Sequence, residues 1–455
     1  MTATSTTRVL SRFIAGFNYE DLSKEAIKEV KRHTLDTLGD ALGAYGYKIK
    51  PVNITLNLIK SMGGREESTI IGDGGKVPCP NATLINTYQS QVLEYNDTHP
   101  DVAAHAGQNV VNSSLAVAER EKVTGRDLIT AIALGYEVEV RVGLGISGLW
   151  GAGAFKHIHI QNTPGPTAAA SKLLRLNEDQ MVDAFGISMA RSLISSEWIY
   201  EDTGYGLWSG MAARDAVMAV LLAREGKGGP EMIIDGKSGI AQLLSTKYDI
   251  NKVVEGLGKT SKVSETWFKY HASGHGSHTS IDAALEVMKK HRINKDEIEE
   301  ITVRASPKLS NAFDPIDSKR KPVNPQAAMF SVPYCVAVAV LRGKVTSDDF
   351  TKEAIIEPER LNVANKVSFI PDPEFPQWAV TLTFKMKDHQ LFSAHVDYPK
   401  GSTKNPVTDR ELEDKFEFLA SKTLSNNKVQ KIISIVDHLE ELGSVSELME
   451  LVKKD

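Results

Sequence analysis

The segment from residue 268 to residue 282 holds the densest group of chemically active side chains in this sequence. A lysine and three histidines occur here among small residues: Lys269, His271, His275 and His278. The apolar spacing that follows predicts a helix with Thr279 or Ser280 as N-cap and Asp282 in its first turn. Because anions bind readily at helix N-termini, this segment is predicted to form the floor of an active site.

A second group of reactive side chains lies at the end of a predicted helix that finishes near Glu94. Asp97, Thr98 and His105 follow, at a point where a proline forces a loop. Loops carried by a rigid helical scaffold commonly supply site residues. The alternative stays open that Asp97 and Thr98 only cap the chain turn and that His99 is solvated.

Two further loops carry imidazole and aromatic side chains. His157 and His159 precede an alanine-rich predicted helix, and taken alone they are better read as surface histidines. Tyr205 lies in a glycine-spaced loop, residues 201–210. This loop is not a dinucleotide fingerprint, because no predicted strand precedes it and no βαβ unit follows it. It is predicted to line a pocket.

The sequence predicts no metal site. It has no HExxH motif, no paired carboxylates at helical spacing and only two cysteines, Cys79 and Cys335. So few cysteines exclude a disulfide framework and favour a reducing compartment. Cys335 lies in an apolar run and is expected to be an inert core thiol.

Composition narrows the class of protein. The 455 residues exceed a usual single core, so two domains are expected, and 41% hydrophobic content suffices to bury them. A net charge of −5 without a basic block argues against nucleic-acid binding. The polar N-terminus has no signal core and no apolar run approaches the roughly 20 residues of a membrane span, so a soluble, cytoplasmic protein is predicted.

The elements that must position these residues are mostly helices. Apolar periodicity predicts helices over 22–42, 81–94, 113–122, 125–144, 167–174, 179–190 and 211–224. After residue 294 the pattern changes to a strand at 301–305 and a hairpin whose strands lie at 378–386 and 391–396. Helical periodicity returns from residue 409 to the end.

The predicted fold is mainly α: a discontinuous all-helical domain with an inserted smaller α+β lid domain. The predicted boundaries are 1–265 for the first part of the helical domain, 266–404 for the lid domain and 405–455 for the C-terminal part of the helical domain.

The order of these motifs resembles one family, the MmgE/PrpD proteins, which include 2-methylcitrate dehydratase, cis-aconitate decarboxylase and iminodisuccinate epimerase. The resemblance extends over nearly the whole chain. The segments that carry it are Glu94 to Thr98, His159 with Gly165 and Pro166, Lys269 with His278 to Ala283, Ala328 to Tyr334, Tyr398 to Pro406, and Lys415 with Phe416.

The resemblance implies a helical domain built from both ends of the chain, an α+β lid, a homodimer, and chemistry without metal or cofactor on a small di- or tricarboxylate. The positions that carry over from the family are Glu94, Thr98, His105, His159, Lys269 and His278. In this reading His159 moves the proton, Lys269 and His275 pair with substrate carboxylates, and Asp97 and Thr98 orient a substrate hydroxyl.

The chain also departs from the family pattern. Tyr205 stands where relatives often carry a lysine, so one cationic carboxylate clamp is missing. His271 and His275 also replace residues frequent in the family. We therefore expect these positions to line the substrate site and to change which carboxylates it accepts.

The predicted function is dehydration of a 2-methylcitrate-like hydroxy-polycarboxylate by proton abstraction beside a carboxylate. An epimerase, an isomerase or a decarboxylase acting on a related substrate is the alternative of the same class. Two other classes stay open: a metal-dependent hydrolase using His275 and His278, and a non-catalytic member that binds a metabolite.

Overall fold

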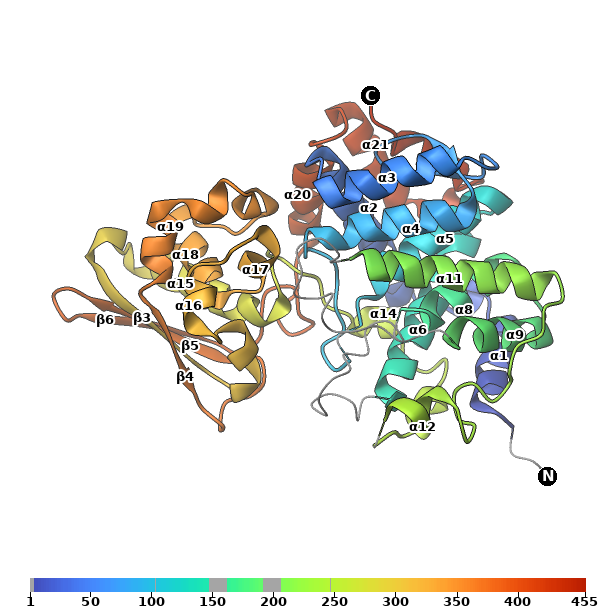
Figure 1. Ribbon diagram of the computed structural model, residues 1–455, viewed down its shortest axis with the longest axis horizontal. Helices are drawn as coiled ribbons and strands as arrows, with labels where there is room; N and C mark the ends of the chain where they lie inside the picture. The colour runs from blue at the N-terminus through green and yellow to red at the C-terminus, as the bar shows by residue number, and fades with distance from the viewer. Residues whose placement is uncertain (1–3, 103, 147–161, 191–205, 246) are drawn as a thin grey trace.

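The chain folds into two lobes of unequal size (Figure 1). The computed structural model describes residues 4–102, 104–146, 162–190, 206–245 and 247–455. The helical lobe contains α1 to α14 and, from the C-terminal end of the chain, α20 to α22; the smaller lobe contains α15 to α19 and a four-stranded sheet. This confirms the predicted mainly α fold with a smaller α+β part. The boundaries at residues 265 and 404 stay a prediction.

Helix α2, Lys24–Gly46, buries polar as well as apolar side chains. Ser23 caps its N-terminus by accepting a hydrogen bond from the Ala26 amide. The helix continues past its predicted end at residue 42. Gly43 does not end the helix but allows close packing, because a Cβ there would lie 2.8 Å from Leu419 of α20, Asp409–Ala420. The close approach of α2 and α20 joins the two ends of the chain in one lobe.

Several of the remaining helices of the helical lobe pack against α2, among them α4, α6 and α21. The predicted helices are confirmed, with ends that shift by a few residues. The bounds are α1 Thr6–Gly16, α3 Lys50–Met62, α4 Cys79–Val92, α5 Asn112–Glu121, α6 Gly125–Ile146, α8 Pro164–Leu173, α9 Glu178–Met189, α11 Leu207–Arg224, α12 Ile240–Leu244, α13 Asn251–Val254, α14 Lys262–Glu265, α21 Asn426–Asp437 and α22 Ser446–Leu451, with a short hairpin of β1 Ser68–Thr69 and β2 Lys76–Val77.

The sheet of the smaller lobe has the strand order β4-β3-β5-β6. Strand β3, Ile298–Ala305, runs parallel to β4, Val367–Pro371, and antiparallel to β5, Val380–Met386. Strands β5 and β6, Leu391–Val396, form the predicted hairpin. Alternate residues of β5 are buried against α15, His278–His291, so one face of the sheet carries the core. The other helices are α16 Ile316–Arg320, α17 Pro325–Met329, α18 Val332–Arg342 and α19 Pro358–Ala364.

The predicted start of α15 was wrong. The helix begins at His278, directly after a 3-10 turn over His275–Ser277, so Thr279 and Ser280 are not caps and Asp282 lies in the second turn. The hydroxyl of Ser277 donates to the Gly274 carbonyl, while the turn itself supplies the carbonyl that accepts the His278 amide. A side-chain cap is therefore replaced by a backbone turn. Cys335 is the expected core thiol, since burial raises its pKa to about 12.

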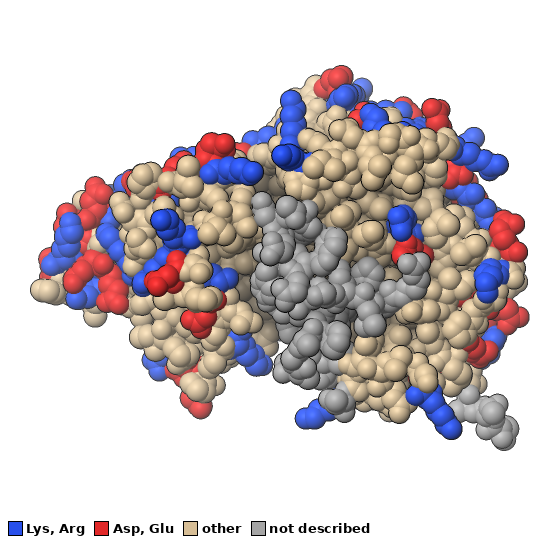
Figure 2. Space-filling model, in the orientation of Figure 1, with Lys and Arg blue, Asp and Glu red and all other residues tan. Residues whose placement is uncertain are grey.

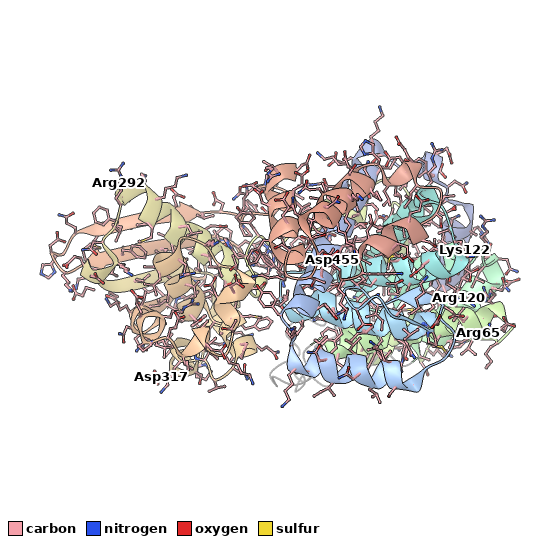
Figure 3. The ribbon with its side chains drawn as sticks, turned by 90° about the horizontal axis from the view of Figure 1, so that it is seen from above. Arg65, Arg120, Lys122, Arg292, Asp317 and Asp455 are labelled. Atoms are coloured by element: carbon pink, nitrogen blue, oxygen red, sulfur yellow. The ribbon has the colours of Figure 1, made fainter. Side chains whose placement is uncertain are left out.

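Viewed from above, the two lobes lie side by side, with Arg292 and Asp317 on the smaller lobe and Lys122 and Asp455 on the helical lobe (Figure 3). Ion pairs cross between them: Lys422, just after α20, lies 2.9 Å from Asp348 of the smaller lobe. The Tyr47 hydroxyl donates to the same carboxylate at 2.6 Å.

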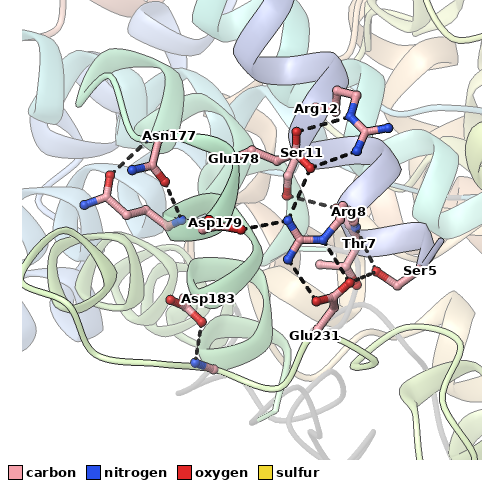
Figure 4. A network of polar contacts seen from close by, with 12 residues as sticks. Ser5, Thr7, Arg8, Ser11, Arg12, Asn177, Glu178, Asp179, Asp183 and Glu231 are labelled. Atoms are coloured by element: carbon pink, nitrogen blue, oxygen red, sulfur yellow. Dashed lines mark hydrogen bonds and ion pairs between the residues drawn. The ribbon is translucent and has the colours of Figure 1, made fainter. Parts of the chain in front are cut away.

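A polar network fixes the N-terminal helix α1 (Figure 4). The Arg8 guanidinium donates to both carboxylate oxygens of Glu231, each at 2.9 Å, and to Asp179 of α9 at 2.7 Å. Bidentate pairing of this kind holds the segment after α11 against α1 and α9. Over the described residues, we find no helix with the length and apolarity needed to cross a membrane.

Candidate functional site

Two segments that are far apart in the sequence meet between the lobes. The first, residues 94–98, follows α4; the second, residues 267–269, follows α14. Thr98 and Trp267 form an antiparallel bridge in which each amide donates to the other's carbonyl at 2.9 Å. This bridge brings the two groups of reactive side chains predicted from the sequence into one site.

A buried ion pair lies at the centre of this site. The Lys269 Nζ is 2.5 Å from Glu94 Oε1, and both side chains are almost completely buried. Glu94 has φ +52°, a left-handed conformation that costs a non-glycine residue about 1 kcal/mol. A strained backbone carrying a buried charge is typical of a functional site, because such strain persists only where the surroundings fix it.

His105 is a neutral base beside this pair. Its Nδ1 lies 2.7 Å from the Asp97 carbonyl oxygen, which accepts only, so Nδ1 carries the proton and Nε2 keeps its lone pair. Burial, followed by the charge of Lys269, lowers the pKa of His105 below its ordinary value of 6.5. At neutral pH this imidazole is ready to accept a proton.

The Asp97 carboxylate is hydrogen-bonded to the turn that carries His105. It accepts hydrogen bonds from the Tyr136 hydroxyl at 2.5 Å and the Gly107 amide at 2.9 Å, and lies 2.8 Å from His33 Nδ1. Burial alone would raise the pKa of Asp97, but these partners lower it. These contacts make Asp97 a support of the site; its predicted contact with a substrate hydroxyl stays a prediction.

Three further histidines come from the segment that leads into α15. His271 Nε2 lies 2.9 Å from Asp282 Oδ1. The ring of His275 packs against Trp267 and Trp378, at centroid distances of 5.3 and 4.7 Å. His278 donates through Nε2 to the Ser273 carbonyl at 3.2 Å, which leaves the Nδ1 lone pair without a partner among the described residues.

The charge of Lys269 reaches three of these imidazoles. Besides burial, which is the larger cause, it lowers the pKa of each. They are His105, His275 and His278. The site therefore combines one ammonium, which can bind a carboxylate, with neutral imidazoles around it, which can move protons.

Helix α2 supplies a group of buried polar side chains next to the site, which the sequence analysis did not identify. His33, Asp36 and Asp40 are buried and lie on one face of the helix, at spacings of three and four residues. His33 stacks on Phe268 at 4.1 Å, next to Lys269. The available signal was this polar stripe at helical spacing, since buried polar groups need partners. Asp36 and Asp40 are carboxylates four residues apart on one helix, so the interpretation that the sequence has no paired carboxylates at helical spacing was wrong.

His159 and Tyr205 lie outside the described residues, so their predicted places in the site stay predictions. The structure brings the other predicted site residues together. Among the described residues, no group of three or more His, Cys, Asp or Glu side chains is arranged to hold a metal ion.

Acidification is expected to destabilise the protein because burial lowers the pKa of three site histidines, His105, His275 and His278. Burial lowers the pKa of His275 to about 3, against 6.5 in the unfolded chain. Between these values the unfolded state binds more protons, so stability is fully present above pH 6.5 and is lost as the pH falls, by up to about 1.4 kcal/mol per pH unit for each such histidine.

Urea denaturation at pH 7.5, 6.5 and 5.5 measures this dependence. His275→Gln should reduce the slope of the unfolding free energy against pH, whereas the exposed His438 should not contribute to it in the same direction. An identical slope in wild type and His275→Gln would contradict the expectation.

Comparison with known proteins agrees with this geometry. The MmgE/PrpD N-terminal domain matches residues 8–252 and the MmgE/PrpD C-terminal domain matches residues 271–441. The chain is 27% identical to cis-aconitate decarboxylase of Homo sapiens, over 99% of this chain and 95% of that protein. It is 25% identical to the cis-aconitate decarboxylase-like protein oryM of Aspergillus oryzae, over 98% and 97% of the two chains.

A relative with another activity also matches. The 2-methylcitrate dehydratase of Salmonella typhimurium is 22% identical, over 92% of this chain and 91% of that protein. Both family domains together cover most of the sequence, and the segments that carried the resemblance meet in one buried site. The chain therefore belongs to the MmgE/PrpD family.

Proposed function

We propose that this protein is a lyase that acts on a small di- or tricarboxylate without a metal ion, with dehydration of a 2-methylcitrate-like hydroxyacid as its first candidate reaction. The observation that carries the proposal is the buried Lys269–Glu94 pair together with the imidazole of His105, which is hydrogen-bonded to the segment that carries Glu94. The ammonium can bind a substrate carboxylate, and the imidazole can take a proton from the carbon beside it.

The chemistry explains why such a site is needed. Removing a proton from a carbon next to a carboxylate builds negative charge that water stabilises poorly. A preplaced ammonium stabilises this charge in the transition state without reorganisation. Departure of the hydroxyl group then requires a proton donor, and His159 is proposed for this step from the resemblance, with Thr98 orienting the hydroxyl.

Decarboxylation of cis-aconitate is the second candidate, because relatives named cis-aconitate decarboxylase match this chain at higher identity than the Salmonella dehydratase. In that reaction the bond to one carboxylate breaks, its electron pair shifts through the double bond, and a proton is added at the former alkene carbon. The same ammonium would serve, but an imidazole near the reacting carbon would have to be protonated first.

Proton NMR in heavy water tests both reactions. The purified, chelator-treated protein is mixed separately with 2-methylcitrate, citrate, cis-aconitate and a panel of hydroxy- and amino-dicarboxylates. A methyl-aconitate signal from 2-methylcitrate supports dehydration, and itaconate from cis-aconitate supports decarboxylation. Deuterium exchange without net product supports an epimerase.

Two outcomes would count against the proposal. Activity that disappears on chelation and returns with zinc would support the metal-dependent hydrolase class instead. Stabilisation of the protein by a carboxylate without any turnover would support a binding protein.

We also propose that the protein forms a homodimer through an apolar face of the helical lobe. Helices α3 and α11 both pack against α4, and Figure 2 shows few charged side chains over this part of the surface. Large apolar side chains 39–66% exposed lie at helical spacing on the two outer helices. They are Ile54, Leu58, Met62, Met211, Met218 and Leu222.

The double variant Leu58→Arg/Met218→Arg is therefore expected to raise the dimer dissociation constant by at least about 100-fold, because it places charge in an apolar contact. Light scattering after size-exclusion chromatography measures the mass. Ile356→Arg, at an equally exposed apolar position of the smaller lobe, is the control and should stay dimeric. A wild-type monomer at micromolar concentration would contradict the proposal.

A further inference from the structure

Lys415 reaches the site from the C-terminal part of the chain. It lies on α20, and its side chain is only 6% exposed because it points inward against α2. A lysine buried to this degree requires a full set of partners. Those partners show what it does.

The three protons of the Lys415 ammonium have three close acceptors. Its Nζ donates to the Tyr95 carbonyl at 2.7 Å and to the Lys269 carbonyl at 3.2 Å, and it lies 2.7 Å from Asp36 Oδ1. The two carbonyls belong to the two segments that carry the Lys269–Glu94 pair. One ammonium therefore binds both backbones immediately beside the charged side chains.

The Tyr95 side chain reinforces this link. The Lys415 Nζ lies 4.1 Å from the centroid of the Tyr95 ring, a cation–π contact. The Tyr95 hydroxyl in turn donates to the Tyr270 carbonyl at 3.2 Å. The Tyr95 side chain thus also joins the two segments, because its hydroxyl binds the residue that follows Lys269.

Two buried carboxyl groups of α2, those of Asp36 and Asp40, lie near the Lys415 ammonium. Asp40 lies 3.9 Å from the ammonium, and neither of its oxygens has a hydrogen-bond partner among the described residues. Burial raises the pKa of Asp40 well above its ordinary range. Asp36, at 2.7 Å, is the carboxylate that pairs with Lys415, while Glu94 pairs with Lys269.

We propose that Lys415 is a positioning residue for the reaction: it holds the backbones of residues 95 and 269 at a fixed separation and so aims the Lys269 ammonium at the substrate carboxylate. This proposal rests on the proposed function, and its experiment includes a measurement that needs no turnover. Misplacement of a reacting group by about 1 Å costs on the order of 100-fold in rate.

The chain offers a matched control for this lysine. Lys422 lies seven residues further on, also joins the C-terminal part to the smaller lobe, and pairs with Asp348 at 2.9 Å. Its contacts are partly exposed and include no atom of residues 94–98 or 267–269. Lys422→Met removes a comparable link between the lobes and leaves the site untouched.

The experiment compares Lys415→Met, Lys422→Met and the double variant Lys415→Met/Asp36→Asn. The double variant avoids an unpaired buried carboxylate and so protects folding. We expect kcat/KM to fall by about 100-fold in both variants that lack Lys415 and to change by less than about twofold in Lys422→Met. A folded Lys415 variant that keeps kcat/KM within about threefold of wild type overturns the proposal.

The measurement without turnover is the 15N signal of the Lys269 Nζ in lysine-labelled protein, assigned by its absence from Lys269→Met. Loss of Lys415 is expected to shift this signal, and loss of Lys422 is not. If wild type converts no tested compound, the proposed function fails and this signal alone decides the position of Lys269. An unchanged signal, or failure of both Lys415 variants to fold, overturns the positioning role.

Discussion

Replacing Lys269 with methionine is expected to lower kcat/KM by about 10²–10³-fold. The ammonium is the cation at the centre of the site, and removing one preplaced group that stabilises developing negative charge typically has this effect. The steady-state rate of whichever reaction the NMR panel identifies provides the measurement.

The same substitution is expected to destabilise the fold by about 3–5 kcal/mol, because it breaks a buried ion pair by removing the ammonium and keeping the Glu94 carboxylate. The double variant Lys269→Met/Glu94→Gln separates the two effects. Neutralising both partners should restore much of the unfolding free energy, measured in urea, but should restore none of the activity.

A matched control lies seven residues earlier. Lys262 pairs with Glu265 at 2.8 Å on a partly exposed surface, where such pairs contribute less than about 1 kcal/mol. Lys262→Met should therefore leave activity and stability near those of wild type. An active, folded Lys269→Met protein would remove the central cation from the proposed mechanism.

Much of the fold follows from local patterns, and the site follows only in part. The helices and the β5–β6 hairpin were predicted because their apolar periodicities are local and strong. The start of α15 was predicted wrongly, because a backbone turn at His275–Ser277 replaces the side-chain cap that the serine and threonine suggested. Residue type alone does not distinguish these two ways of satisfying amide groups.

The resemblance to the family brought Glu94, Thr98, His105 and Lys269 into one site hypothesis, although 175 residues separate the two partners of the ion pair. It did not reveal how these residues are held. Lys415 lies in a segment that carries the resemblance, and Asp36 belongs to the polar stripe of α2. Neither pattern indicates the backbone carbonyls or the buried charge pair through which these residues act. Such supports require tertiary structure to recognise.

The environment of a residue also decides its chemical role in a way that its type does not. Four histidines line this site, but their partners differ: a carboxylate for His271, two tryptophans for His275, and backbone carbonyls for His105 and His278. A carbonyl partner fixes the proton on one nitrogen and leaves the other nitrogen free to act as a base. Of the two histidines with such a partner, His278 is completely buried, whereas His105 is partly exposed, so His105 is the better placed base.

Replacing His105 with glutamine is accordingly expected to lower kcat by about 10²–10⁴-fold, the usual contribution of a general base. The glutamine amide can still donate to the Asp97 carbonyl, so the turn should be retained and the melting temperature should change little. His291→Gln, at the far end of α15, is the control and should keep full activity.

The pH profile then distinguishes the two candidate reactions. If His105 accepts a proton, as dehydration requires, kcat/KM falls as the pH drops below its lowered pKa, and this acid limb disappears in His105→Gln. If His105 donates a proton, as decarboxylation requires, kcat/KM instead rises toward acid pH, because only the protonated imidazole is active. A neutral imidazole in the free protein favours the first profile. A carboxylate-rich substrate would raise the pKa of His105 when bound. Comparing the pH profile of kcat with that of kcat/KM therefore measures how far the bound substrate raises this pKa.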